Sequence, residues 1–361
     1  MLLMHLLRAH AHNKTSVRHT NYRLVFLEEG PLVAEVKTLG YEAMAILPGR
    51  LRNVPGILST VMRLRREFER TRADIVLSWM PKAHFYSAPA AALAGVTSAW
   101  WQHGVTQGHW MDRSVTLLPA RRVLCCSNAV ADAQKSLFPK RSTRVIYPAV
   151  ELDRFDPARL PSPSDARREL GLPVDGFVIG AVARLQSQKG LNVFIDAAAA
   201  ISKNRPAPYF VIVGGVHAPE PAHQSELKKQ VEQLGLTDRL RLAGHQENVA
   251  LWMQAMDMVV LPSVEPEGFG MVLIEAMALG KLVIATALGG ALEIIEDRKD
   301  GILVPPRDSA TLATAIVQLF ADKRLRDSLR LAARRKAECF SADSLATALE
   351  RELFAMHPVP K

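Results

Sequence analysis

The sequence predicts an α/β protein built from two doubly wound domains. Short apolar runs that resemble buried strands alternate with segments of helical periodicity along most of the 361 residues. This alternation is typical of parallel sheets covered by helices on both faces. Four prolines cluster between Val150 and Asp175, as in an interdomain linker. The length also favours two domains, at roughly 100–200 residues each.

Seven apolar runs are the candidate strands, and three longer segments between them have helical spacing. The strands are Arg23–Leu27, Ile75–Ser78, Val123–Cys126, Phe177–Ala183, Tyr209–Val213, Met258–Leu261 and Leu282–Ala285. The helical segments are Leu191–Asn204, Gln224–Leu234 and Thr311–Phe320, and a short helix at Ser164–Leu170 is expected within the linker. Binding sites in such sheets lie at the carboxyl ends of the strands.

Composition excludes several classes of protein. A hydrophobic content of 48% excludes global disorder and fibrous architectures. No run of 18 apolar residues predicts a transmembrane helix, and the opening MLLMHLLRAHAHNK lacks the order of a signal peptide. Three cysteines without a CxxC pair make neither a disulfide framework nor a zinc site. We expect a cytoplasmic protein, with peripheral contact at the inner face of the membrane.

The net basic excess lies entirely in the first part of the chain. The formal net charge is +9; residues 1–150 hold 20 Lys and Arg against 9 Asp and Glu, and the remainder holds 25 against 27. The densest stretch, Arg50–Arg72, places Ile57, Val61, Leu64 and Phe68 at helical spacing. Three interpretations stay open: a solvated arginine face, docking on an anionic membrane, and nucleic-acid binding. No zinc finger or basic zipper accompanies the arginines, so we expect no nucleic-acid partner.

Several catalytic motifs are absent. The chain has no GxxxxGK[ST] phosphate loop, no strand–GxGxxG–helix unit, no HExxH and no GxSxG. It also has no Asp-x-Asp pair, which disfavours coordination of a diphosphate through a metal ion. Anion binding by side chains and helix ends is the alternative.

Two cations follow the strand at 177–183. Arg184 and Lys189 lie in one loop, five residues apart, before a helix that starts near Gly190. At the carboxyl end of a strand, such a pair is suited to bind two phosphates, and ordinary surface charge is the alternative.

A second loop combines glycines with carboxylates. Gly268 and Gly270 allow the backbone to approach a ligand, and the helix from about Met271 directs free N–H groups toward the loop. Glu267 and Glu275 make chemical sense there as acceptors for sugar hydroxyls. Cations, a helix N-terminus and hydroxyl acceptors together indicate a nucleoside diphosphate sugar.

Other strand exits carry further candidates. Gly214 follows the strand at 209–213, and Gly289 and Gly290 are expected close to the same ligand. In the first half, His103 ends the apolar stretch that contains Trp100. A histidine at such a position is suited to contact the transferred sugar, although a structural role is the alternative.

These motifs resemble those of the retaining glycosyltransferases of family 4, which have the GT-B fold. The similar segments are ARLQSQKG (183–190), FVIVGG (210–215), LPSVEPEGFGMVLIEAMALG (261–280), IATALGGALEII (284–295) and DGILVPPRD (300–308). The spacing between Glu267 and Glu275 is the family's signature. The resemblance implies two Rossmann-like domains that face a central cleft, at residues 1–155 and 156–337, and a helix in 338–361 that crosses back to the first domain.

The resemblance also implies roles for the candidates. Arg184 and Lys189 would bind the donor diphosphate, and the backbone of Phe269–Val272 would line it. Glu275 would hold the ribose and Glu267 the donor sugar, while His103 falls near the reacting centre. Retention by front-face attack is implied, without a metal or other cofactor. The acceptor would be a glycan or lipid-linked molecule of cell-envelope polysaccharide or lipopolysaccharide synthesis.

The start of the chain departs from the family. Family members open with a buried strand, whereas this chain opens with a segment that resembles the first helix, so the first domain is expected to lack its first, central strand. We therefore expect a truncated chain or an impaired enzyme. The alternatives are a scaffold that binds nucleotide sugar without turnover, or another GT-B enzyme such as a sugar-nucleotide epimerase or a phosphorylase.

Overall fold

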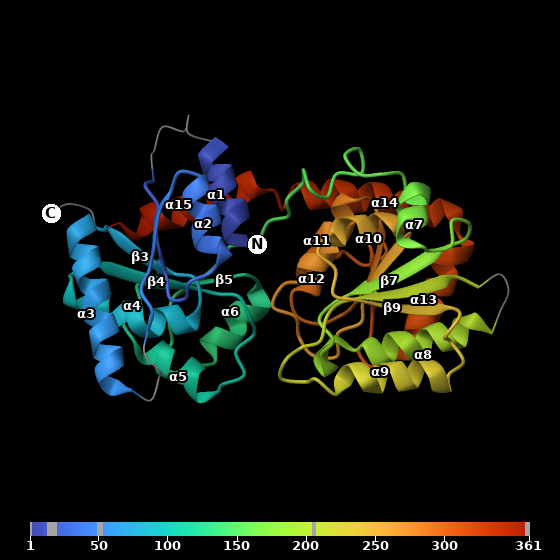
Figure 1. The fold of residues 1–361 in the computed structure, drawn as a ribbon, viewed down its shortest axis with the longest axis horizontal. Helices are drawn as coiled ribbons and strands as arrows, with labels where there is room; N and C mark the ends of the chain where they lie inside the picture. The colour runs from blue at the N-terminus through green and yellow to red at the C-terminus, as the bar shows by residue number, and fades with distance from the viewer. Residues whose placement is uncertain (1, 13–19, 49–52, 204–206, 358–361) are drawn as a thin grey trace. The chain divides into compact units, whose positions relative to one another are not determined.

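The structure is a computed structural model that describes residues 2–12, 20–48, 53–203 and 207–357. The chain divides into two compact units: Met1–Ala149 with Ala342–Lys361, and Val150–Ser341. Both consist of parallel strands and helices, which confirms the α/β class (Figure 1). Of the predicted segments, Arg50–Arg52 and Asn204 lie outside the described residues.

The second unit is built on one six-stranded sheet. Its order is β12-β11-β10-β7-β8-β9, and every neighbouring pair is parallel. The strands are β7 (Val178–Val182), β8 (Tyr209–Val213), β9 (Leu240–Gly244), β10 (Met258–Leu261), β11 (Leu282–Thr286) and β12 (Ile302–Val304). The strand order reverses between β7 and β10, so the carboxyl ends of these two strands form a topological switch point, where ligands bind in such sheets.

Helices cover both faces of this sheet. They are α7 (Pro163–Leu170), α8 (Leu191–Ser202), α9 (His223–Gln233), α10 (Val249–Ala255), α11 (Met271–Ala278), α12 (Ala291–Ile294), α13 (Ser309–Ala321) and α14 (Lys323–Glu338), with a 3₁₀ turn at Ser187–Lys189. α8 and α9 lie on one side of the sheet, and α10 and α14 lie on the other (Figure 1). The core between sheet and helices includes the fully buried rings of Phe194 and Phe210. Burial of these apolar faces fixes the loops at the sheet edges.

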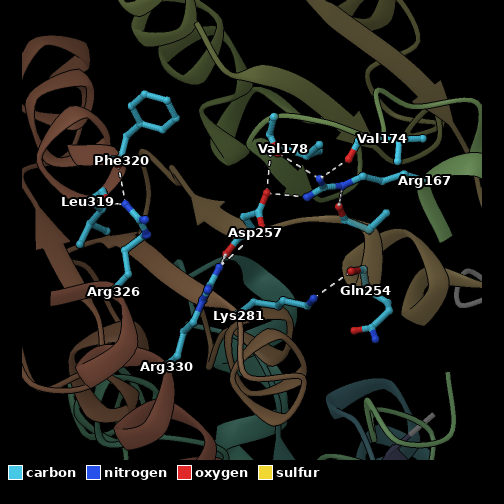
Figure 2. A network of polar contacts seen from close by, with 12 residues as sticks. Arg167, Val174, Val178, Gln254, Asp257, Lys281, Leu319, Phe320, Arg326 and Arg330 are labelled. Carbon is cyan, nitrogen blue, oxygen red and sulfur yellow. Dashed lines mark hydrogen bonds and ion pairs between the residues drawn. The ribbon is translucent and has the colours of Figure 1, made fainter. Parts of the chain in front are cut away.

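A polar network ties together the amino-terminal edge of the same sheet (Figure 2). The Asp257 carboxylate, just before β10, accepts from the Arg167 guanidinium at 2.5 Å and from the Val178 N–H at 2.8 Å. Arg330 lies 3.6 Å from the same carboxylate, and Lys281 donates to the Gln254 carbonyl at 2.8 Å. Because Asp257 and Lys281 directly precede β10 and β11, the network lies at the edge opposite the carboxyl ends and serves the fold.

The first unit contains two parallel sheets, a pair β1-β2 and a four-stranded sheet β3-β4-β5-β6. The strands are β1 (Arg23–Phe26), β2 (Glu42–Ala45), β3 (Ile75–Ser78), β4 (Thr97–Gln102), β5 (Arg122–Cys125) and β6 (Thr143–Val145). The helices are α1 (Leu2–His12), α2 (Pro31–Thr38), α3 (Val54–Thr71), α4 (Pro81–Leu93), α5 (Trp110–Leu117), α6 (Asn128–Lys135) and the C-terminal α15 (Ala342–Met356).

The two sheets of the first unit are separated where a central strand was expected to be missing. Among the described residues β1 pairs only with β2, β3 pairs only with β4, and no strand lies between them. Val25 of β1 and Val76 of β3 nevertheless pack against one cluster, which includes Val61 and Tyr86. Shared packing against α3 and α4 therefore holds the two sheets in one unit.

The sequence analysis did not predict five of the strands: β2, β4, β6, β9 and β12. β2 and β9 carry charged residues and are only partly buried, and β6 and β12 are three residues long. β4 is buried at five of its six positions, but its sequence TSAWWQ lacks the aliphatic run expected of such a strand. Its indole rings supply the buried area instead, which hydropathy patterning detects poorly.

Candidate functional site

Loops at the carboxyl ends of β7, β10 and β11 are joined by backbone hydrogen bonds. The Val264 N–H, after β10, donates to the Gln188 carbonyl at 2.9 Å, after β7. The Gly290 N–H, after β11, donates to the Glu267 carbonyl at 3.0 Å. These bonds join segments far apart in sequence, so the three loops form one structured edge at the switch point.

Two glycines let these loops approach more closely than any side chain permits. Gly190 has a φ of +61°, and a Cβ there would lie 2.0 Å from the Pro262 carbonyl oxygen. At Gly214, after β8, a Cβ would lie 1.7 Å from the carbonyl oxygen of Ala183. Both positions require glycine because backbone, which cannot give way, occupies the space of the missing side chain.

Lys189 and Glu267 form an ion pair across this edge. The Lys189 Nζ lies 2.6 Å from Oε1 and 2.8 Å from Oε2 of Glu267, and each side chain is only 14% exposed. The buried Ser263 hydroxyl donates to Oε1 at 2.5 Å, and the Ser263 carbonyl accepts from the Thr286 hydroxyl at 2.6 Å. A chain of hydrogen bonds from β11 thus fixes the orientation of the Glu267 carboxylate.

The glycines after β11 support the same segment. A Cβ on Gly289 would lie 2.3 Å from the Glu267 carbonyl oxygen, and a Cβ on Gly290 would lie 2.4 Å from the Cα of Phe269. The Phe269 ring is buried and lies 5.5 Å from the ring of Phe340, measured between centroids. These glycines therefore contact the 267–269 backbone and help to fix its path.

The loop ends at the N-terminus of α11. Gly270 has a φ of +104° and provides no side-chain cap for this eight-residue helix. Leu273 N–H donates to the Gly270 carbonyl at 2.9 Å, whereas Met271 and Val272 are the first two helical residues and have no acceptor in a preceding turn. Gly268 precedes this turn. The two N–H groups and the helix dipole favour an anion at this position.

Glu275 lies on the second turn of α11 and is partly buried. Burial raises the pKa of its carboxyl to about 7, and the positive charge of Arg154 offsets only part of this effect. Among the residues that the structure describes, none donates a hydrogen bond to this carboxylate. Its oxygens are therefore available to accept hydrogen bonds from the hydroxyls of a ligand.

Arg184 occupies the start of the loop after β7. The neighbouring Leu185 N–H donates to the Gly215 carbonyl at 3.0 Å, which ties this loop to the one after β8. The Arg184 side chain is exposed and forms no ion pair within the described part of the chain. It therefore belongs to the same edge as Lys189 without contacting it.

His103 belongs to the first unit, where it follows β4. Its ring lies 5.5 Å from Trp79 and 5.1 Å from Trp101, and burial lowers the pKa of the imidazole to about 4. Its Nε2 is buried without a hydrogen-bond partner among the described residues. The ring is neutral near pH 7, so it suits a hydrogen bond with a hydroxyl and not the binding of an anion as a cation.

The structure thus brings the candidates of the second unit to one sheet edge. Lys189 and Glu267 are in direct contact, and Arg184, Gly214, Gly268–Val272 and Glu275 lie on the loops and helix around them. Sequence analysis missed Ser263 and Thr286; the available signal was a serine two residues after β10 and four before Glu267.

The described residues provide neither a metal site nor a membrane-spanning helix. Over residues 2–12, 20–48, 53–203 and 207–357, no group of three or more His, Cys, Asp or Glu is placed to hold a metal ion. Within the same ranges, no helix combines the length and apolar character needed to cross a bilayer.

Two family models match the chain in adjacent ranges. The model described as "Glycosyl transferases group 1" matches residues 164–336. The model described as "Glycosyltransferase Family 4" matches residues 17–154. Together the two ranges take in most of the chain and correspond to its two halves.

Curated relatives and solved structures agree with these models. A D-inositol 3-phosphate glycosyltransferase of Jonesia denitrificans is 38% identical over 56% of this chain and 49% of its own length. A lipopolysaccharide core biosynthesis mannosyltransferase, LpsB, of Rhizobium meliloti is 31% identical over 50% of this chain and 51% of its own. The chain spans about half the length of the curated relatives it matches. The crystal structure of Anabaena HepE in complex with UDP and glucose shares the fold, with a TM-score of 0.81, 24% identity, and coverage of 97% of this chain and 95% of that one.

Proposed function

Because this chain belongs to the glycosyltransferases of group 1 and family 4, with the GT-B fold, we propose that it transfers a sugar from a nucleoside diphosphate donor to a glycan or lipid-linked acceptor. The observation that carries the proposal is the Lys189–Glu267 pair beside the N-terminus of α11, at the switch point between β7 and β10. This edge offers positive and hydroxyl-accepting groups together, which is what a nucleotide sugar requires.

The diphosphate is assigned to the positive groups. Lys189 and Arg184 supply side-chain positive charges, and the N–H groups of Met271 and Val272 supply backbone donors at the helix terminus. As the donor enters, the Lys189 ammonium comes to be shared between Glu267 and a phosphate oxygen. These groups stabilise the negative charge that develops on the leaving diphosphate.

The hydroxyls of the donor are assigned to the carboxylates. Glu275 accepts from the ribose, which satisfies a carboxylate that has no donor among the described residues. Glu267 accepts from the transferred sugar in the orientation set by Ser263. We assign His103 to the acceptor side as a neutral hydrogen-bonding group; because its Nε2 is buried, a contact through that atom requires the ring to move.

We propose retention of configuration without a metal ion. The bond between the anomeric carbon and the β-phosphate oxygen breaks, and the acceptor oxygen bonds to the same face of that carbon. The acceptor's proton passes to the leaving β-phosphate. Lys189, Arg184 and the helix N–H groups carry the charge stabilisation that a metal supplies in other transferases.

The acceptor is proposed to belong to cell-envelope polysaccharide or lipopolysaccharide synthesis. The relatives named for an inositol phosphate and for a lipopolysaccharide core support an anionic acceptor. The basic excess of residues 1–150 complements such an acceptor and an anionic membrane surface. We therefore place the protein in the cytoplasm, peripheral to the inner face of the membrane.

The first experiment is a thermal-shift panel of uridine, guanosine and adenosine diphosphate sugars on the full chain. Uridine diphosphate glucose is the first probe, because Anabaena HepE was solved with UDP and glucose. Selective stabilisation by one nucleotide is expected, followed by release of that nucleoside diphosphate when an acceptor is added. No stabilisation by any of the three would contradict the assigned site.

Product analysis separates this proposal from its alternatives. Transfer with the donor's anomeric configuration, seen by proton NMR of the product, supports a retaining transferase. Binding without turnover across a panel of anionic acceptors would assign a scaffold. An epimerised donor without acceptor would assign an epimerase, and turnover that requires inorganic phosphate would assign a phosphorylase.

A further inference from the structure

Helix α3 has an apolar stripe that faces solvent, in addition to the apolar face that enters the core. Val61, Leu64 and Phe68 are buried in the cluster that holds α3 against α4. On the outer face, Val54 is 62% exposed and Leu58 is 60% exposed. Met62, one turn further along, is 38% exposed.

The spacing places these exposed side chains on one ridge. Val54, Leu58 and Met62 are each four residues apart, so they lie one above the other on the helix surface. Removal of apolar side chains from water is favourable. A contiguous row of exposed apolar residues therefore marks an interaction site more often than single exposed residues do.

Unpaired arginines continue the stripe. Arg66 follows Met62 on the same ridge, and Arg63 lies beside it; both are exposed, and neither pairs with a carboxylate of the described residues. By contrast, Arg65 lies 2.7 Å from Glu69, and Arg70 lies 2.6 Å from Glu67. The ridge on the outer face of α3 is therefore apolar from Val54 to Met62 and carries uncompensated positive charge directly after Met62.

Another basic helix, α14, lacks this combination. Its last turn carries Arg335 and Lys336. Leu331 is the single large hydrophobic residue of α14 that is exposed. Basic charge alone thus does not distinguish α3. The apolar ridge next to unpaired arginines does.

We propose that the outer face of α3 docks on an anionic lipid bilayer. Lipid headgroups supply phosphates for Arg63 and Arg66, and the region just beneath them takes up Val54, Leu58 and Met62. A hydrophilic polyanion would match the charges but leave the apolar ridge in water. An apolar protein partner would cover the ridge but leave the two guanidiniums without counter-charge.

The topology places the start of α3 at the same sheet edge as His103. α3 connects β2 to β3, so its N-terminus lies near the carboxyl ends of the strands, the edge where His103 follows β4. A lipid-linked acceptor in the bilayer would then meet the acceptor side of the protein. Docking itself does not depend on the proposed transfer reaction.

The test is flotation of the full chain with vesicles of phosphatidylcholine, alone or mixed with phosphatidylglycerol. Three variants are compared with the parent: Arg63→Gln with Arg66→Gln, Leu58→Ser with Met62→Ser, and Leu58→Ser with Arg66→Gln. The matched control, Leu331→Ser with Arg335→Gln, makes the same pair of changes on α14. All substituted residues are exposed, and circular dichroism checks folding.

We expect the parent to bind the mixed vesicles at least about tenfold more tightly than the neutral ones, and loss of both arginines to weaken that binding about 30-fold. Loss of Leu58 and Met62 weakens it as well, whereas the α14 control binds like the parent.

Equal binding to both vesicles, or binding that the α3 variants do not change, would overturn the proposal. So would a dimer in sedimentation velocity that Leu58→Ser with Met62→Ser dissociates, because a second copy would then cover this face. Nucleotide binding, read by thermal shift, is unaffected in every α3 variant, so failure of docking and failure of the donor site are separable.

Discussion

The ammonium of Lys189 bridges both carboxylate oxygens of Glu267, at 2.6 Å and 2.8 Å, although the two residues are 78 positions apart in sequence. One loop follows β7 and the other follows β10, the strands between which the order of the sheet reverses. Without a donor, the cation expected to bind phosphate is therefore neutralised by the acid expected to bind sugar. Removal of either partner leaves the other free to face the ligand, and we expect the two removals to impair different steps.

Lys189→Ala is expected to weaken binding of a nucleoside diphosphate sugar by about 1.5–3 kcal/mol, or roughly 10- to 150-fold in Kd. A charged contact is lost, and the uncompensated Glu267 carboxylate then repels the diphosphate. Isothermal titration calorimetry with the donor identified by thermal shift measures the effect. The control is Lys228→Ala, whose side chain is 72% exposed and lies 4.0 Å from Glu232; an equal loss in the control would remove the assignment.

Glu267→Ala and Glu275→Ala should separate the sugar from the nucleoside. Glu275→Ala is expected to weaken the binding of free nucleoside diphosphate and of nucleotide sugar alike, because both ligands carry the ribose. Glu267→Ala spares the free nucleotide and impairs sugar transfer. Calorimetry with both ligands, with initial rates of transfer, tests this; the opposite pattern would mean that the two roles are exchanged.

Glu275→Gln should change the pH dependence of stability. Burial raises the pKa of Glu275 from its ordinary 4.5 to about 7 in the folded protein, so the folded state binds the proton more tightly than the unfolded state does. Its contribution to stability is therefore fully present below pH 4.5 and lost as the pH rises to 7. At pH 8 the variant should be more stable than the parent by up to roughly 3 kcal/mol, with no such gain at pH 4.5. Urea unfolding at the two pH values gives the difference, and a gain independent of pH would contradict the assigned titration.

Ser263→Ala should act through Glu267. Loss of the 2.5 Å hydrogen bond leaves the Glu267 carboxylate less well oriented, at a cost of about 1 kcal/mol in sugar transfer. Binding of free nucleoside diphosphate should stay unchanged, and kcat should fall more than KM rises. Thr314→Val is the matched control, since that hydroxyl donates only to the Ala310 carbonyl on α13. If Ser263→Ala impaired nucleotide binding as strongly as transfer, its role would be to hold the whole loop.

Lys281→Met, in the network of Figure 2, should leave the folded protein equally stable or make it more stable near pH 7. Burial lowers the pKa of Lys281 to about 8, so the unfolded state binds the proton more tightly and the parent gains stability as the pH rises from 8 to 10.5. Methionine removes the cost of burying the charge and loses one hydrogen bond to the Gln254 carbonyl. We expect equal or higher stability at pH 7, by up to about 2 kcal/mol, and a smaller gain from pH 8 to 10 than the parent shows. Urea unfolding at both pH values tests this, and marked destabilisation at pH 7 would show that the ammonium is needed.

The sequence located most of the candidate site because its residues follow buried strands. Arg184, Gly214, Glu267 and Gly289 all come directly after, or within a few residues of, apolar runs that formed β7, β8, β10 and β11. In a parallel sheet these exits must share one edge, so the order of strands along the chain was enough to group them. The glycines marked the positions where loops approach closely.

The side-chain contacts within that edge could not be predicted from the sequence. Which carboxylate neutralises Lys189, and which is left without a donor, depends on the relative positions of the loops after β7 and β10 to within a few tenths of an ångström. The role of Ser263 follows from the same geometry, since a serine at a strand exit has no distinctive pattern. The burial of His103 is likewise a result of packing, because the indoles of Trp79 and Trp101 come from two different strand ends.

By itself, then, the sequence determined the α/β class, the sheet edge that carries the candidate site and the amphipathic character of α3, since each follows from local periodicity and strand order. Tertiary structure alone decided the Lys189–Glu267 contact, the raised pKa of Glu275 and the exposure of Val54, Leu58 and Met62. These depend on which side chains from distant segments exclude water from one another, and no local pattern encodes that.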